Sequence, residues 1–176
     1  GKALINLGGS YSDLGRHTEA LPPAEEAVRV SRELTKSNPA YLGYLGKALI
    51  NLGWNYTMLD RRAEALPTGE EAVRVSRELA KSNAAYLEDL AMALHNLGIA
   101  YTLFGRAGEA VSPMEEALRV FRELAKSNPV YLGQLATSLD ALGMICTVLG
   151  RHAEALPLME EAKRIRRQLA EGNPAN

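Results

Sequence analysis

Apolar residues recur along the chain at steps of three and four, the spacing of one face of an α-helix. Within residues 41–56 they stand at Tyr41, Leu45, Ala48, Leu49, Leu52 and Tyr56. A second periodic run extends from about Arg62 to Lys81, with its small and aliphatic residues facing inward and Glu70, Arg74 and Glu78 facing outward at steps of four. The sustained apolar and polar alternation of a β-strand is absent from the sequence. The pattern therefore predicts an all-α chain built from helix pairs.

The ends of the first predicted helix carry residues that favour helix termini. Asn38 can cap the N-terminus, and Pro39 occupies the first helical position, where its missing N–H costs nothing. The helix should end near Asp60, whose equivalents elsewhere in the chain are Gly15, Gly105 and Gly150. Glycine just after a helix commonly adopts the left-handed conformation that ends it.

The pattern of the helix pair repeats every 45 residues. The segment GKALINLG at residues 1–8 recurs letter for letter at 46–53, and EEAVRVSREL at 25–34 recurs at 70–79 with drifting copies at 115–124 and 160–169. We therefore divide a single domain into four units: residues 1–45, 46–90, 91–135 and 136–176. A period of this length is typical of arrays that stack helix pairs into one continuous core.

Proline is the one feature that conflicts with this pattern. Each second helix carries one roughly a turn after its start, at Pro22, Pro67, Pro113 and Pro157. An interior proline removes a hydrogen bond and tends to kink a helix. Because the flanking periodicity is so regular, we expect a slight bend or a loosened first turn rather than a break.

These residues resemble the tetratricopeptide repeat (TPR), whose signature places Leu-Gly and an aromatic residue on the first helix and small residues on the second. Leu52-Gly53, Tyr56, Ala65 and Ala72 stand at the matching spacings, and units one and three repeat the match. Unit four has Cys146 where the aromatic residue belongs. The resemblance implies a right-handed α-solenoid, a superhelical stack of four antiparallel helix pairs.

The period is longer than the usual 34 residues of the family by about three helical turns, so both helices can lengthen without rotating their core faces. Long units of this kind resemble the repeats of kinesin light chains. They resemble still more the arrays attached to signalling ATPase or caspase-like modules in bacteria and fungi.

Composition excludes several functional classes. Lys and Arg number 20 against 21 Asp and Glu, and this balance argues against a dedicated nucleic-acid or anionic-membrane binder. A single cysteine excludes a disulfide framework and a thiolate metal site. The sequence has no apolar run of about 18 residues and no signal peptide, so we expect a cytoplasmic protein. It begins with Gly1, and we expect a fragment of a longer protein.

Residues capable of catalysis are scattered rather than convergent. His17 and His152 occupy a turn position that Arg62 and Ala107 fill in the other units, which favours a solvated histidine. His95 lies on a first helix and is expected at the surface or in a groove. Adjacent glutamates on a helix do not face one another, and Cys146 is expected to be a small buried hydrophobic residue. We therefore predict no enzyme, no cofactor and no metal site.

In tetratricopeptide repeat proteins, which this sequence resembles, the first helices line the concave side of the superhelix. Four positions per unit, at steps of four, three and four, are expected to face it. Position by position, each across units one to four, they are Lys2, Lys47, Met92 and Thr137; Asn6, Asn51, Asn96 and Ala141; Gly9, Trp54, Ile99 and Met144; and Asp13, Met58, Leu103 and Val148.

This concave stripe carries the functional prediction. A side-chain amide can pair with the N–H and C=O groups of a peptide, although the asparagines can instead bond locally between first helices. The apolar residues can form a groove or merely pack helix against helix. Lysine and asparagine together are similar to a carboxylate clamp, but Met92 and Ile99 leave that clamp incomplete. The residues predicted to bind a partner are Asn6, Asn51, Asn96, Trp54, Met58, Ile99, Leu103 and Met144.

The predicted function is non-enzymatic binding of a peptide or partner segment in the concave groove, as the sensor or scaffold part of a larger protein. The alternative is a structural spacer or a self-assembling array without a peptide ligand. Lys163 and Arg166 replace residues that are mostly apolar in the other units, so we expect a polar last unit and an array that ends near Asn176. The truncated first unit leaves weak self-association through that end open.

Overall fold

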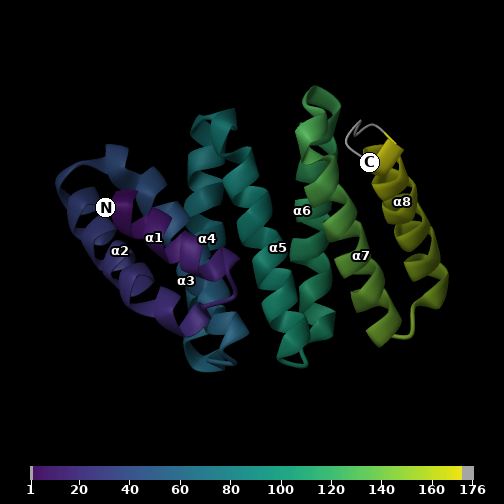
Figure 1. The fold of residues 1–176 in the computed structure, drawn as a ribbon, viewed down its shortest axis with the longest axis horizontal. Coiled ribbons are helices and arrows are strands. Elements are labelled where there is room, and N and C mark those ends of the chain that lie inside the picture. Colours follow the sequence, from purple (N-terminus) through teal and green to yellow (C-terminus); the bar gives the residue numbers. More distant parts are fainter. Residues whose placement is uncertain (1, 172–176) are drawn as a thin grey trace.

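The computed structural model describes residues 2–171, which form four antiparallel helix pairs. Figure 1 shows the pairs following one another along the long axis of the molecule. The all-α, helix-pair prediction is confirmed. The α-helices are α1 (Lys2–Asp13), α2 (His17–Ser37), α3 (Leu42–Met58), α4 (Arg62–Ser82), α5 (Leu87–Leu103), α6 (Ala107–Ser127), α7 (Leu132–Val148) and α8 (His152–Glu171).

A short 3-10 turn connects each pair to the next. In these turns, η1 (Pro39–Tyr41), η2 (Ala84–Tyr86) and η3 (Pro129–Tyr131), a preceding asparagine supplies the cap. The side-chain oxygen of Asn38 accepts a hydrogen bond from the Ala40 N–H at 2.9 Å, and Asn83 and Asn128 make the same bond. The predicted cap is therefore present, but it caps a 3-10 turn that leads into the α-helix.

The turn inside each pair has the predicted left-handed residue. Gly15, Gly105 and Gly150 have φ angles of 70°, 77° and 74°, and Asp60 has a φ of 54°. Aspartate tolerates this conformation better than most residues that carry a side chain, because its short polar group can bond locally. The chain thus reverses direction at the same place in every unit.

The second helices run without interruption through their prolines. Pro22, Pro67 and Pro157 lie on the exposed side of their helices, so water can reach the carbonyl that each ring leaves unbonded. Buried alanines on the opposite side, such as Ala65 and Ala72, hold the helix against its neighbour. The expectation that proline would not break these helices is confirmed.

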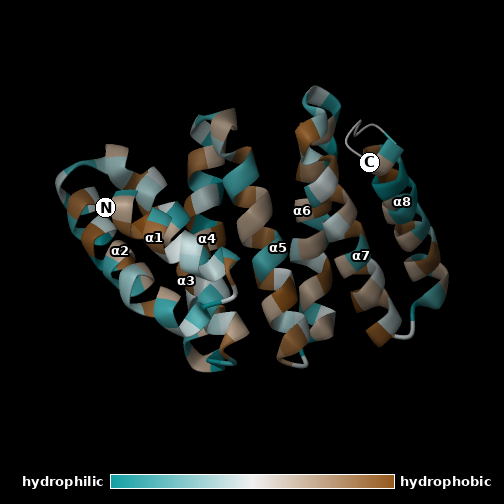
Figure 2. Ribbon diagram, viewed as in Figure 1, coloured by the Kyte–Doolittle hydropathy of each residue, from teal (hydrophilic) through white to brown (hydrophobic). Residues whose placement is uncertain are grey.

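Small residues set the distance between the two helices of a pair. A Cβ atom added to Gly53 on α3 would lie 3.4 Å from the backbone nitrogen of Gly69 on α4. The first helices α3, α5 and α7 are more hydrophobic than the second helices α4, α6 and α8, and Figure 2 shows many hydrophilic residues along α8. The buried core contains residues from both helices of each pair and extends from unit one to unit four.

Successive units contact each other differently on their two sides. The first helices pack directly, α1 on α3, α3 on α5 and α5 on α7. The second helices are linked by ion pairs that recur every 45 residues: Arg32–Glu71 at 2.5 Å, Arg77–Glu116 at 2.7 Å and Arg122–Glu161 at 2.7 Å. Direct packing on one side and long bridging side chains on the other place the first helices on the inner side of the array.

Glu70, Arg74 and Glu78, the outward charges of α4, do not form ion pairs with one another. Arg74 lies 3.9 Å from Glu71 instead, and Glu70 accepts a hydrogen bond from the Tyr101 hydroxyl at 2.8 Å. Tyr56 donates in the same way to Glu25. Contacts between units therefore use carboxylates that the sequence pattern assigned to solvent.

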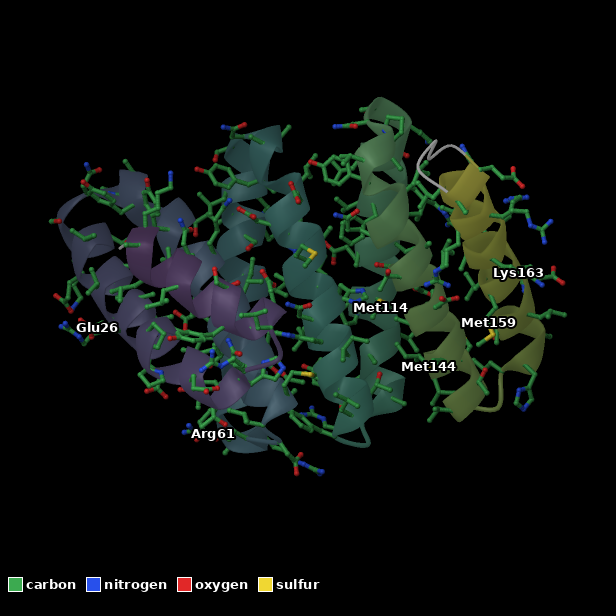
Figure 3. All side chains as sticks on the ribbon, in the orientation of Figure 1. Glu26, Arg61, Met114, Met144, Met159 and Lys163 are labelled. Atoms are coloured by element: carbon green, nitrogen blue, oxygen red, sulfur yellow. The ribbon has the colours of Figure 1, made fainter. Side chains whose placement is uncertain are left out.

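The last unit presents charged residues at its outer side. Lys163, Arg166 and Arg167 are exposed on α8, and Arg166 forms an ion pair with Asp140 of α7. Lys163 is labelled on α8 in Figure 3. Asn176 lies outside the described residues, and the end of the array near it stays a prediction.

Two buried hydroxyl groups have no hydrogen-bond partner within residues 2–171, those of Ser31 and Ser76. Replacing Ser76 with alanine is expected to raise the free energy of unfolding by about 1 kcal/mol, because the cost of burying an unbonded hydroxyl disappears. Urea denaturation followed by circular dichroism measures the change. Ser112→Ala on the exposed side of α6 controls for helix propensity, and equal gains in both variants would contradict the prediction.

Candidate partner-binding groove

A groove crosses the inner side of the array and is lined by residues from all four first helices. Its volume is about 460 Å³. The lining residues are Gly9, Ser12, Asp13, Ile50, Asn51, Trp54, Met92, His95, Asn96, Phe121, Gly133, Gln134, Thr137 and Ser138. Phe121 comes from α6, a second helix, and forms part of the floor.

The groove brings together three of the eight residues predicted to bind a partner, Asn51, Trp54 and Asn96. Trp54 is part-buried and is the only tryptophan in the sequence. Asp13 and Thr137, which the concave stripe also contained, lie in the groove as well. Each of the four first helices therefore contributes at least one residue of the stripe to the lining of the groove.

The other predicted residues lie outside this lining. Asn6 is exposed and belongs to a second recess near the start of the first helices. Met58 and Ile99 are part-buried, and Ile99 packs against the core. Leu103 and Met144 are more than half exposed, at 56% and 54%, near the C-terminal ends of α5 and α7. Figure 3 labels Met144 on α7.

The asparagines of the stripe have different surroundings. The Asn51 amide donates to the carbonyl of Ile5 on the neighbouring first helix at 3.4 Å, which is the local bond that the sequence left open as an alternative. Asn96 makes no hydrogen bond through its side chain within residues 2–171. Asn96 is therefore the asparagine of the groove whose amide is available to a ligand.

His95 forms part of the groove wall. Its Nδ1 lies 3.0 Å from the hydroxyl of Ser138 on α7, and burial lowers the pKa of the imidazole to about 4. The ring is therefore neutral at pH 7. The Ser138 side chain is almost completely buried at 1% exposure, so its hydroxyl cannot reach a ligand as a nucleophile. The expectation of a groove histidine agrees with this position.

His17 differs from its predicted solvated position, whereas His152 is exposed as expected. The His17 ring is part-buried, and its Nδ1 lies 2.9 Å from the side-chain oxygen of Asn55. Asn55 is fully buried on α3 and donates its amide to the Asn51 carbonyl at 2.8 Å. The buried amide needs a second partner, and His17 supplies it from the preceding unit.

The second recess, with a volume of about 500 Å³, is lined by both lysines of the incomplete clamp, Lys2 and Lys47. The Lys47 ammonium lies 3.7 Å from Asp89, another lining residue. Burial raises the pKa of the Asp89 carboxyl, while Lys47 acts in the opposite direction. Because a carboxylate already faces Lys47, this recess is poorly suited to an anionic ligand.

Within residues 2–171, no group of three or more histidine, cysteine or acidic residues is arranged to hold a metal ion. Cys146 is buried, and burial raises the pKa of its thiol, as expected for a small hydrophobic core residue. A bilayer-spanning helix is not found in this part of the chain. The chemistry of the groove is that of hydrogen bonds, apolar contact and one carboxylate.

Two tetratricopeptide repeat models match the chain, one over residues 1–78 and the other over residues 90–129 and 135–174. Together they cover most of the sequence, and the chain belongs to the tetratricopeptide repeat family. Domains of this family are generally protein–protein interaction modules and typically non-catalytic, and no enzyme family matches the chain.

Two solved structures with TM-scores above 0.5 share the fold at low sequence identity. The crystal structure of MamA has a TM-score of 0.63 at 20% identity, covering 97% of this chain and 80% of that one. BtubC (BKLC) from P. vanneervenii has a TM-score of 0.51 at 18% identity, with coverage of 99% and 83%. A protein from Podosopora anserina assigned as a kinesin light chain with TPR-like repeats reaches 0.42 at 19% identity, with coverage of 97% and 96%. No curated protein sequence matches the chain.

Proposed function

We propose that this TPR array is a non-enzymatic recognition module that binds a partner segment, extended or as a short helix, in the groove. The observation that carries the proposal is a recess of about 460 Å³ that crosses all four first helices and combines a part-buried Trp54 with the unpaired amide of Asn96. Apolar surface with a few convergent polar groups is typical of binding sites. Within a larger protein, such a module would act as the sensor or scaffold segment.

The affinity expected of such a groove is micromolar, roughly −8 kcal/mol, because a single short segment buries only modest area. Trp54 is the best candidate anchor, since tryptophan truncations at interfaces often cost about 2 kcal/mol or more. Asn96 would hold the polar backbone of the segment through its amide.

The test is a selection of binders from a random dodecapeptide library, followed by affinity measurements on variants. Trp54→Ala is expected to lower the affinity for the selected peptides at least tenfold, and Asn96→Ala several-fold. The helicity and melting temperature of both variants should be nearly unchanged. Tyr44→Ala and Asn6→Ala are matched controls, because these residues line the second recess.

The outcomes separate the proposal from the spacer alternative. If both groove variants bind the peptides normally while Tyr44→Ala weakens them, the second recess is the site. If both groove variants unfold, Trp54 and Asn96 are core residues and the structural spacer becomes the better interpretation. If no selected peptide depends on Trp54, the groove has no role in binding.

A further inference from the structure

We propose that the groove selects partner segments with a basic side chain, arginine or lysine, which binds between Asp13 and Trp54 at the unit-one end. This inference rests on the proposed function and specifies its partner. It follows from the charge of the groove, from the open space around Asp13, and from the way the chain holds its own arginines.

Asp13 is the only charged residue among those that line the groove at neutral pH. It is exposed and makes no ion pair within residues 2–171. It is also the last residue of α1, where the backbone carbonyls of the helix end add partial negative charge. This end of the groove therefore attracts cations, and no lysine or arginine belongs to the lining.

Gly9 leaves open space on the face of α1 that carries Asp13. It lies one turn before Asp13 on the same face of α1, at the position that Trp54 occupies in the next unit. A Cβ atom on Gly9 would meet only the Asn51 amide nitrogen within 4 Å, at 3.5 Å. The side of the groove that holds the carboxylate and the indole is therefore unobstructed.

The chain itself binds guanidinium groups with the same two components. Arg61 lies over the ring of Tyr56 at 4.6 Å and forms an ion pair with Glu64, and Arg106 repeats this with Tyr101 and Glu109. An aromatic face attracts a cation, and indole does so more strongly than phenol. Trp54 and Asp13 offer an aromatic ring and a carboxylate in one groove whose lining contains no arginine.

The remaining groups that face the groove do not compete for this cation. His95 is neutral at pH 7 because burial holds its pKa near 4, and Gln134, Asn96 and Thr137 are uncharged. The nearest basic residues of the stripe, Lys2 and Lys47, line the second recess. A segment in the groove is therefore expected to be basic at the unit-one end and uncharged towards unit four.

The first test uses N-acetyl-L-argininamide and its neutral isostere N-acetyl-L-citrullinamide as probes. Since Trp54 is the only tryptophan, the indole N–H resonance of the protein comes from this groove residue. Argininamide is expected to shift this resonance until the site is saturated. Citrullinamide is expected to bind with an affinity at least fivefold lower. Asp13→Asn should reduce the affinity for argininamide to that for citrullinamide. Glu78→Gln, on the outward side of α4, should leave the affinity for argininamide unchanged. Equal shifts by both probes, or no effect of Asp13→Asn, would overturn the proposal.

The second test separates this inference from the proposed function. The peptides that bind the Trp54→Ala variant more weakly are expected to be enriched in arginine or lysine. Their affinity is also expected to fall at least fivefold on Asp13→Asn. Groove-binding peptides without basic residues would refute the selectivity and leave the proposed function intact. If all of the selected peptides are insensitive to Trp54→Ala, they bind elsewhere, and both the selectivity and the proposed function are contradicted.

Discussion

Replacing Gly53 with leucine is expected to lower the free energy of unfolding by about 3 kcal/mol, the upper end of the usual cost of overpacking. The reason is that α3 and α4 meet backbone to backbone at this point. A Cβ atom would already lie 3.4 Å from the Gly69 nitrogen and 3.6 Å from the Gly69 Cα, and neither can rotate away as a side chain could. The further atoms of leucine must therefore push the helices apart. Urea denaturation followed by circular dichroism measures the loss.

Gly108→Leu is the matched control for this prediction. A Cβ atom at Gly108, near the start of α6, would meet nothing within 4 Å, and the residue is exposed. The same substitution there should leave stability unchanged or raise it slightly through helix propensity. Comparable losses in both variants would show that α3 and α4 are not in close contact at Gly53.

The sequence predicted the fold well because each structural signal occurs several times. The left-handed residue after the first helix stands at Gly15, Asp60, Gly105 and Gly150, and all four have positive φ angles. Close helix contact at a small residue was equally predictable from Leu-Gly and the buried alanines. These features depend on residues near one another in sequence, and the 45-residue period then carries them along the chain.

Polar pairs between units were not predictable in the same way. His95 pairs with Ser138, 43 residues later, and His17 pairs with Asn55, 38 residues later. A signal for the first pair does exist in the repeats. Where His95 and Ser138 stand, the earlier units have Ile5 with Ala48 and Ile50 with Ala93. Because both positions change from an apolar to a polar residue, the two changes together indicate a contact between His95 and Ser138. His95 considered alone indicated only a position at the surface or in a groove.

The candidate site was predicted in part. Helical spacing placed Asn51, Trp54 and Asn96 on the inner side, where the groove contains them. Spacing cannot tell how deep a groove is along its length, because depth depends on the angle between successive units. That angle arises from contacts such as Tyr101–Glu70 and Arg77–Glu116, which join residues 31 and 39 positions apart. Whether the exposed Leu103 and Met144 contribute to binding stays a prediction.

The His95–Ser138 pair is expected to make the array sensitive to acid. The folded-state pKa of His95 is about 4, below its ordinary value of 6.5, because burial disfavours the imidazolium ion. Between these values the unfolded chain binds a proton that the folded chain does not. The contribution of His95 to the free energy of unfolding is therefore fully present above pH 6.5 and is lost as the pH falls towards 4. At about 1.4 kcal/mol per pKa unit, reduced by the contact of the ring with groove water, the loss from His95 is about 2 kcal/mol.

A double variant isolates this contribution from that of the many carboxylates. His95→Ile combined with Ser138→Ala restores the apolar pair that units one to three share, so neither partner is left buried and unbonded. Urea denaturation at pH 7.5 and pH 4.5 is expected to show a drop in unfolding free energy about 2 kcal/mol smaller in the double variant than in the parent. Surface carboxylates paired with arginine, such as Glu19 and Glu109, have lowered pKa values and titrate alike in both proteins, so they cancel in the difference. Identical drops would mean that the His95 imidazole protonates in the folded state as readily as in the unfolded chain. The groove would then carry a positive charge below pH 6, opposite in sign to Asp13.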